Sequence, residues 1–205
     1  MTMLTPATAR EYWGALVENA AHLVADADRL FPSPRSQSLV VLAHEEIGKA
    51  AWVSKAFWKA WHGGDVTSPI EVPELDEHGT HHIPKLKSAY ESVSDDEARF
   101  VLTGDALAEW EAEREAWNHG WARADNLAKQ RGFYVDLDGN GGFTTPDTVP
   151  RPGLRLDMWA AADSVLWTIH EAQFGASVSK TREVMPDLSE AEAMVKAVTE
   201  KYWDG

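Results

Sequence analysis

The sequence contains no cysteine, which excludes disulfide bonds and thiolate chemistry and fits a reducing compartment. It also has no run of about 18 consecutive apolar residues, the length that a membrane-spanning helix needs. Residues 1–20 include no apolar stretch suited to a signal peptide. We therefore expect a cytoplasmic protein with no membrane segment.

Positive charge is scarce. The sequence has 19 Lys and Arg against 33 Asp and Glu, which gives a formal net charge of −14. This sign opposes non-specific attraction to nucleic acid or to anionic lipid. Contact with RNA would therefore need a local basic patch or the interface of an oligomer.

Tryptophan is abundant, with ten among 205 residues. Most of them fall within helical patterns, so we expect a core or an interface rich in large flat side chains. The length suits one substantial domain and is too short for two comfortable ones. We treat residues 1–205 as a single domain.

Apolar residues recur at steps of three or four along five segments, the spacing typical of amphipathic helices. These segments are residues 6–30, 36–61, 105–130, 154–180 and 188–203. The second segment is apolar nearly all round, which is typical of a central buried helix. A shorter helix is expected after Pro84, whereas residues 63–80 are rich in proline, glycine and acid and are expected to form a loop. The pattern predicts an all-α fold, an antiparallel helical bundle with a short hairpin-like insertion around 133–146.

Two of these segments carry finer predictions. Along 105–130 the expected buried positions are Leu107, Trp110, Trp117, Trp121, Ala124 and Leu127. In the last segment, Ser189 and Glu192 have the spacing of a capping box, in which the two side chains bond to backbone N–H groups of the first turn.

The first motif that could carry chemistry is LAHEEIGK, residues 42–49. Glu46 lies on the same helical stripe as Leu42 and Phe57, where an unpaired carboxylate would be costly to bury. Lys49 is one turn further on and can pair with Glu45 or Glu46. One interpretation is an ordinary salt bridge at the edge of a helix. The other is an internal polar cluster that needs partners from another helix.

The second motif is HHIPKL, in which His82 and Lys85 lie around the start of a helix. Together with backbone N–H groups, they could hold a phosphate or a carboxylate such as that of Glu46. The alternative is an exposed loop histidine. The neighbouring His78 and His81 could suggest a metal, but the sequence offers no cysteine and no fixed ligand spacing for zinc. We predict no metal site and no cofactor.

The third motif is REAWNH, with Arg114 and His119 inside a long helix. Arginine can fork onto a phosphate, and histidine can act as general acid or base near neutral pH. Such a pair could cleave RNA without metal by helping the 2′-hydroxyl attack its own phosphate. Five helical steps place the two side chains about 140° apart, so one chain does not present them on one face. Two solvent-facing polar residues are the alternative.

The fourth motif is DLDGNGGFTTPD, residues 136–147, which matches most of a calcium loop. Its ligand positions are Asp136, Asp138, Asn140 and Thr144, but the twelfth position is Asp147 instead of the usual glutamate. Pro146 precedes it, and the sequence has no second loop to pair with. The alternative is a hairpin, since Asp-Gly and Asn-Gly are strong turn formers.

The order of these motifs resembles the AbiV-type abortive infection proteins of bacteria, which are placed in the HEPN superfamily of helical domains. An apolar helix with EEIGK is followed by H-x-x-K and then by a long helix that ends in RGFYVD before a glycine-rich turn. The resemblance runs from about Ala7 into the segment 154–180. It implies a helical bundle with a role in antiphage defence.

The resemblance also implies an activity, because many HEPN proteins are metal-independent endoribonucleases. They act as dimers in which an arginine and a histidine from each subunit meet at a shared cleft. On this basis the expected catalytic residues are Arg114, His119, Glu46, Lys49, His82 and Lys85. The expected binding residues are Glu45, Arg131, Tyr134 and Asp136. We further expect Glu46, Lys49, His82, Lys85, Arg131 and Asp136 to converge, so that buried charges satisfy one another.

Two hypotheses follow for the function. The first is an antiphage effector that cleaves RNA and stops translation, with a homodimer and an RNA substrate as the expected partners. The second is a non-enzymatic helical module that senses a phage protein or pairs with an antitoxin, which the acidic charge and the many tryptophans favour.

Overall fold

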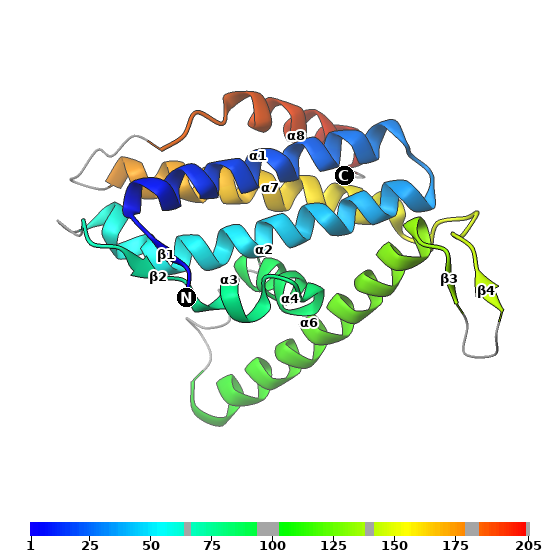
Figure 1. Ribbon diagram of the computed structural model, residues 1–205, viewed down its shortest axis with the longest axis horizontal. Helices are drawn as coiled ribbons and strands as arrows, with labels where there is room; N and C mark the ends of the chain where they lie inside the picture. Colours follow the sequence, from blue (N-terminus) through cyan, green and yellow to red (C-terminus); the bar gives the residue numbers. More distant parts are fainter. Residues whose placement is uncertain (64–66, 94–102, 138–141, 179–184, 204–205) are drawn as a thin grey trace.

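The computed structural model describes residues 1–63, 67–93, 103–137, 142–178 and 185–203. Within them lie seven helices: α1 (Pro6–Arg29), α2 (Pro34–His62), α3 (Pro73–His78), α4 (His82–Val93), α6 (Gly104–Phe133), α7 (Leu154–Val178) and α8 (Ser189–Tyr202). The predicted all-α helical bundle is confirmed. Helix α2 is central and packs against α1, α4, α6 and α7 (Figure 1).

The first two helices begin at residues that the sequence marks as helix starts. Thr5 precedes Pro6, and its hydroxyl accepts a hydrogen bond from the Thr8 backbone N–H. Ser33 does the same for Ser36, again with a proline at the first helical position. Proline is favoured there because its missing N–H would have no partner within the helix.

The core lies where α1, α2, α7 and α8 meet. Its largest fully buried side chains include Trp13, Ile47, Phe57, Met158 and Ile169. Burial of apolar surface on this scale is the main force that holds the bundle together. The helix predicted to be central is therefore buried as expected.

Gly48 allows α2 and α4 to approach closely. A Cβ atom built on Gly48 would lie 1.8 Å from the Lys85 carbonyl oxygen, far inside any permitted contact. The glycine of EEIGK is thus required by packing, and it brings the glutamates of that motif beside the start of α4.

The insertion after α6 is a hairpin. Strand β3 (Asp136–Leu137) pairs antiparallel with β4 (Phe143–Thr144), with Leu137 opposite Phe143. This confirms the hairpin-like insertion. Residues 138–141, which would form its turn, lie outside the described residues.

Two local predictions are wrong. Residues 63–80 contain a strand, β2 (Ile70–Glu71), which pairs with β1 (Met3–Leu4), and also the short helix α3. At α8 the capping box does not form, because the Glu192 carboxylate accepts hydrogen bonds from His170 and Gln173 instead. Tertiary partners on α7 thus replace the local bond.

The buried face of α6 also differs from the prediction. Trp117, Trp121 and Leu127 are exposed, with 69%, 52% and 46% of their surface accessible. The buried residues are Ala122, Asp125, Lys129 and Gly132. Small and charged side chains therefore face α2 and α4, while the N-terminal half of α6 leaves the bundle (Figure 1).

None of the described helices combines the length and the apolar character needed to cross a membrane.

Candidate functional site

Glu45 is the centre of a buried charge cluster. Its side chain is 4% exposed and lies on the face of α2 that meets α4 and α6. Lys129 Nζ lies 2.6 Å from Glu45 Oε1. Lys85 Nζ and His82 Nδ1 lie 3.1 Å and 2.9 Å from Glu45 Oε2. We call these four residues the Glu45 cluster.

Burial and pairing oppose each other at Glu45. Burial raises the pKa of this carboxyl, but hydrogen bonds from Lys129 and His82 and the charges of both lysines outweigh it, so the pKa lies below its usual range. Burial lowers the pKa of Lys129, and the bond to Glu45 only partly compensates. The lowered pKa of Glu45 and the lowered pKa of Lys129 are consistent with each other, because two buried lysines share a single carboxylate and one cation is in excess.

Glu46, the neighbouring acid of the motif, makes the helix-edge salt bridge that is one of the two interpretations of this motif. Glu46 Oε2 lies 2.6 Å from Lys49 Nζ, one turn along the same helix, and both side chains are partly exposed. The ordinary salt bridge at a helix edge therefore applies to Glu46, and the internal polar cluster applies to Glu45. The predicted convergence is right for His82 and Lys85 and wrong for Glu46 and Lys49.

The Glu45 cluster borders a surface depression of about 950 Å³, which we call the hairpin depression. Its lining residues are His82, Leu127, Lys129, Gln130, Arg131, Tyr134, Phe143, Thr144, Thr145 and Asp147. The Asp147 N–H donates to the Arg131 carbonyl at 2.7 Å, which fixes the returning chain beside the end of α6. Arg131 and Tyr134 are exposed here, outside the buried cluster. Two cations and a histidine thus line this concave surface, together with one carboxylate, that of Asp147.

The Asp136 backbone lies in β3, but its side chain is outside the described residues, as are Asp138 and Asn140 of the predicted calcium loop. The calcium alternative therefore stays a prediction. Among the described residues, no group of three or more histidine, aspartate or glutamate side chains is placed to hold a metal ion.

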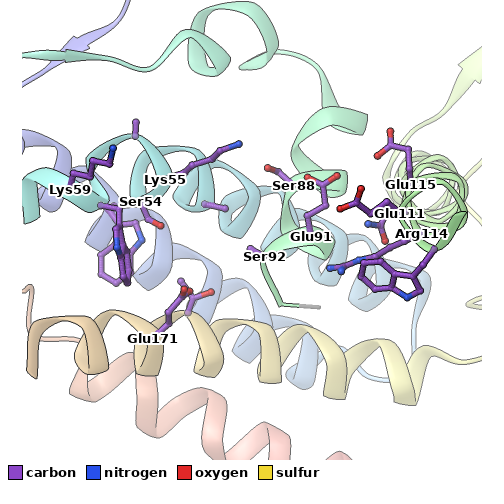
Figure 2. Close-up of a pocket in the computed structure, with 17 residues that line it drawn as sticks. Ser54, Lys55, Lys59, Ser88, Glu91, Ser92, Glu111, Arg114, Glu115 and Glu171 are labelled. Carbon is purple, nitrogen blue, oxygen red and sulfur yellow. The ribbon is translucent and has the colours of Figure 1, made fainter. Parts of the chain in front are cut away.

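Arg114 and His119 lie on the half of α6 that leaves the bundle. Arg114 stacks over Trp110, 4.8 Å from its ring centroid, and lines a groove of about 840 Å³ between α2, α4, α6 and α7. Figure 2 shows Arg114 beside Glu111 and Glu115, with Lys55 and Lys59 on the opposite wall. His119 is exposed and does not line this groove. One chain does not bring the two side chains to one face, as their spacing predicts.

A second buried polar cluster was not predicted. The Tyr90 hydroxyl donates to Asp125 Oδ2, and the Arg151 guanidinium forms ion pairs with both Asp125 and Asp157. Gln37 Nε2 donates to Asp157 Oδ2 at 3.4 Å, and Gln37 Oε1 accepts from the Arg151 backbone N–H at 3.1 Å. We call these five residues the Arg151 cluster. It joins α2, α4, α6 and α7 through the loop that follows the hairpin.

Burial is the largest single influence on the pKa values of Asp157, Tyr90 and Arg151. It raises the pKa of Asp157, which the Arg151 charge only partly offsets. It also raises the pKa of Tyr90, together with the negative charge of Asp125, so the phenol stays protonated as a hydrogen-bond donor. Burial lowers the pKa of Arg151, but the two carboxylates outweigh it and the net direction is upward.

One sequence signal could have found Lys129 and Asp125. Ala122, Asp125, Lys129 and Gly132 recur at steps of three, four and three, the period of one helical face. Two small residues on such a stripe indicate close helix packing, and the charged residues between them then need buried partners. No comparable signal marks Arg151, which lies in a loop.

Comparisons with known proteins give one match. A family model for HEPN domains of the AbiV type, described as AbiV, matches residues 8–167. A search of the curated proteins and a search of the solved structures both return no significant match. The matched range covers α1 through the first half of α7 and includes both buried clusters.

Proposed function

This chain belongs to the AbiV family of HEPN-domain proteins, the abortive-infection proteins of antiphage defence, and from that premise we propose that it cleaves RNA. The proposed activity is that of a metal-independent endoribonuclease that acts as a homodimer and stops translation in the infected cell. Arg114 and His119 are the proposed catalytic residues.

The observation that carries the proposal is the exposure of the N-terminal half of α6. In the part of the chain that the structure describes, no residue from 103 to 121 is buried, although this stretch contains Trp110 and Trp117. Glu115 pairs with Lys87 of α4, but every residue of this stretch stays at least partly exposed, so it can bury further surface against a second copy. Five helical steps set about 140° between Arg114 and His119 within one helix. A two-fold axis beside α6 would bring the Arg114 and His119 side chains of two copies together in spite of this angle.

The chemistry needs only groups that such a dimer supplies. One His119 imidazole takes the proton from a ribose 2′-hydroxyl, whose oxygen then forms a bond to the adjacent phosphorus. The bond from phosphorus to the 5′-oxygen breaks, and the imidazolium formed in the first step protonates that oxygen, so one His119 serves as base and then as acid. Arg114 forks onto the phosphate and stabilises its developing charge. The products are a 2′,3′-cyclic phosphate and a 5′-hydroxyl.

The hairpin depression supports binding of the RNA backbone. Lys129, Arg131 and His82 line it, and the Glu45 cluster behind it holds two lysines against one glutamate. Phosphates are bound chiefly by such cations. On a chain of net charge −14, a local excess of positive charge is what RNA contact requires.

The test is cleavage of total cellular RNA and of purified tRNA by the purified protein, with and without EDTA. We expect cleavage that EDTA leaves unchanged, and a loss of roughly 10²–10⁴-fold in His119→Ala, the range for a general acid or base. His22→Ala is the control, because His22 is an exposed histidine of α1. Arg123→Ala, at an exposed arginine of α6 itself, is the control for Arg114→Ala. Absence of cleavage under every condition, including after addition of lysate from phage-infected cells, would remove the proposal.

The second candidate function is a non-enzymatic module that binds a phage protein or an antitoxin. The exposed Trp117 and Trp121 favour it, since tryptophan is enriched in protein interfaces. If Arg114→Ala and His119→Ala protect cells from phage as well as the wild type does, this function replaces the first.

A further inference from the structure

A cavity of about 290 Å³ lies beside the Arg151 cluster, between α2, α4, α6 and α7. Its volume is close to the lower end of the range for small-molecule sites, about 300–1,000 Å³. It is separate from the groove that contains Arg114, although Asn118 lines both. We call it the tryptophan cavity.

Aromatic rings form much of its wall. Trp117 and Trp121 come from α6, Tyr90 from α4 and His44 from α2. Tyr90 makes edge-to-face contacts with both His44 and Trp121, with ring centroids 5.4 Å and 6.4 Å apart. Exposed tryptophans beside buried aromatic rings form a surface on which a flat ring can stack.

The polar groups of the cavity are mainly hydrogen-bond acceptors. Asp157 uses Oδ2 to bind Gln37 and Arg151. The Ser164 hydroxyl donates to the Ala160 carbonyl at 2.7 Å, and the Tyr90 hydroxyl donates to Asp125, so both hydroxyl oxygens can still accept. The formal charges of Asp125, Asp157 and Arg151 sum to −1. The cavity therefore disfavours anions and favours a ligand with N–H donors.

His44 adds a buried polar ring to the wall of the cavity. Its ring is 5% exposed, and its Nδ1 makes no hydrogen bond of normal geometry to any described residue. Burial lowers the pKa of His44, while the Asp125 charge and the nearby Val40 carbonyl only partly oppose this, so the ring is neutral. A neutral imidazole offers one donor and one acceptor, and buried polar atoms of this kind normally have a partner.

We propose that the tryptophan cavity binds a nucleobase, a flat heteroaromatic ring that bears an exocyclic amino group. The ring would stack on Trp121 and Trp117, the amino group would donate to Asp157 or Ser164, and His44 would bond to the edge of the ring. The sugar and any phosphate would remain outside, away from the net negative charge. This proposal does not depend on RNA cleavage, because a chain without nuclease activity could still bind a base.

The first experiment is calorimetric titration of the whole protein with adenosine and with N6,N6-dimethyladenosine, two probes that differ in the donors of the amino group. We expect adenosine to bind and the dimethyl compound to bind at least about tenfold more weakly, the effect of one lost hydrogen bond to a buried acceptor. Cytidine and guanosine carry an amino group and should bind, whereas uridine lacks one and should bind more weakly than cytidine.

Two variants locate the binding. Ala160→Leu fills the cavity with a larger side chain, and Trp121→Ala removes one wall; both should weaken adenosine binding at least about tenfold. Trp167→Ala is the matched control, because Trp167 is an equally exposed tryptophan of α7, 54% against 52%, outside the cavity lining. Since Trp121 is exposed, its replacement should leave the fold intact, and unchanged melting temperatures would verify this.

A single-stranded oligonucleotide identifies the source of the base. Binding of free adenosine but not of the oligonucleotide assigns the cavity to a mononucleotide, and binding of both assigns it to RNA; either result supports the base-binding site. Absence of binding by all nucleosides and by the oligonucleotide would overturn the proposal. Binding that survives in both Ala160→Leu and Trp121→Ala would overturn it as well.

Discussion

Lys129 reaches Glu45 across the interface between α6 and α2, and the two side chains are only 3% and 4% exposed. Their atoms Nζ and Oε1 are 2.6 Å apart. Because Lys85 pairs with the same carboxylate, Glu45 binds two cations from two different helices. The EEIGK element is therefore a structural junction of three helices as well as a border of the hairpin depression.

Glu45→Gln should destabilise the protein strongly. Removal of the negative charge leaves Lys85 and Lys129 buried without a counter-charge, a change that costs about 3–5 kcal/mol. Glu46→Gln is the control, because it alters the adjacent residue and breaks only a partly exposed pair with Lys49, for which about 0–1 kcal/mol is expected. Urea unfolding followed by circular dichroism measures both. Equal effects of the two substitutions would show that the Glu45 cluster adds no stability.

The stabilisation by Glu45 should depend on pH in a defined direction. Its pKa is lower in the folded protein than in the unfolded chain, so its contribution is complete above the unfolded pKa, about 4.3. It is lost as the pH falls through the folded pKa. The difference in unfolding free energy between the wild type and Glu45→Gln should be constant above about pH 5 and shrink below about pH 4. A difference that grows at acid pH would contradict the assigned shift.

Helix type and order were readable from the sequence because apolar spacing and helix starts are local signals. Thr5-Pro6 and Ser33-Pro34 mark the beginnings of α1 and α2 as the structure has them. The choice between Glu45 and Glu46 was not readable. Adjacent residues differ by about 100° around a helix, and on a helix that is apolar nearly all round both directions point to packed neighbours.

The tryptophan spacing predicted the wrong face of α6, since such spacing indicates a buried stripe only when the helix has a partner along its whole length. In this chain Trp117 and Trp121 are exposed, whereas Asp125 and Lys129 are buried because Tyr90, Arg151 and Glu45 are present to pair with them. Such partners lie on other elements, and one sequence does not reveal them.

Gly48→Ala should destabilise the packing of α2 on α4. The new Cβ atom would overlap the Lys85 carbonyl oxygen at 1.8 Å, and the backbone of α4 would have to move. We expect a loss of about 1–3 kcal/mol, the usual cost of overpacking. Gly120→Ala is the control, since no described heavy atom lies within 4 Å of its Cβ position and alanine favours a helix by about 1 kcal/mol over glycine. Thermal unfolding of the two variants should therefore shift in opposite directions.

A catalytic site formed by residues of both subunits can be tested by mixing two inactive variants. If Arg114 and His119 act from both subunits at one cleft, Arg114→Ala and His119→Ala should each be inactive, but a mixture of the two should regain activity. A heterodimer of these variants retains one intact arginine from one subunit and one intact histidine from the other. With random exchange of subunits, half of the dimers are mixed and each has one competent pair, so about a quarter of the wild-type rate is expected.

The mixture is prepared by unfolding and refolding the two variants together, with refolded wild type as the reference for recovery. Light scattering after size-exclusion chromatography reports whether each variant is dimeric. RNA cleavage that appears only in the mixture would establish that the subunits share the site. Dimeric variants that stay inactive when mixed would contradict the shared cleft. A monomeric wild type that cleaves RNA would contradict the dimer itself, since one α6 helix does not bring Arg114 and His119 to the same face.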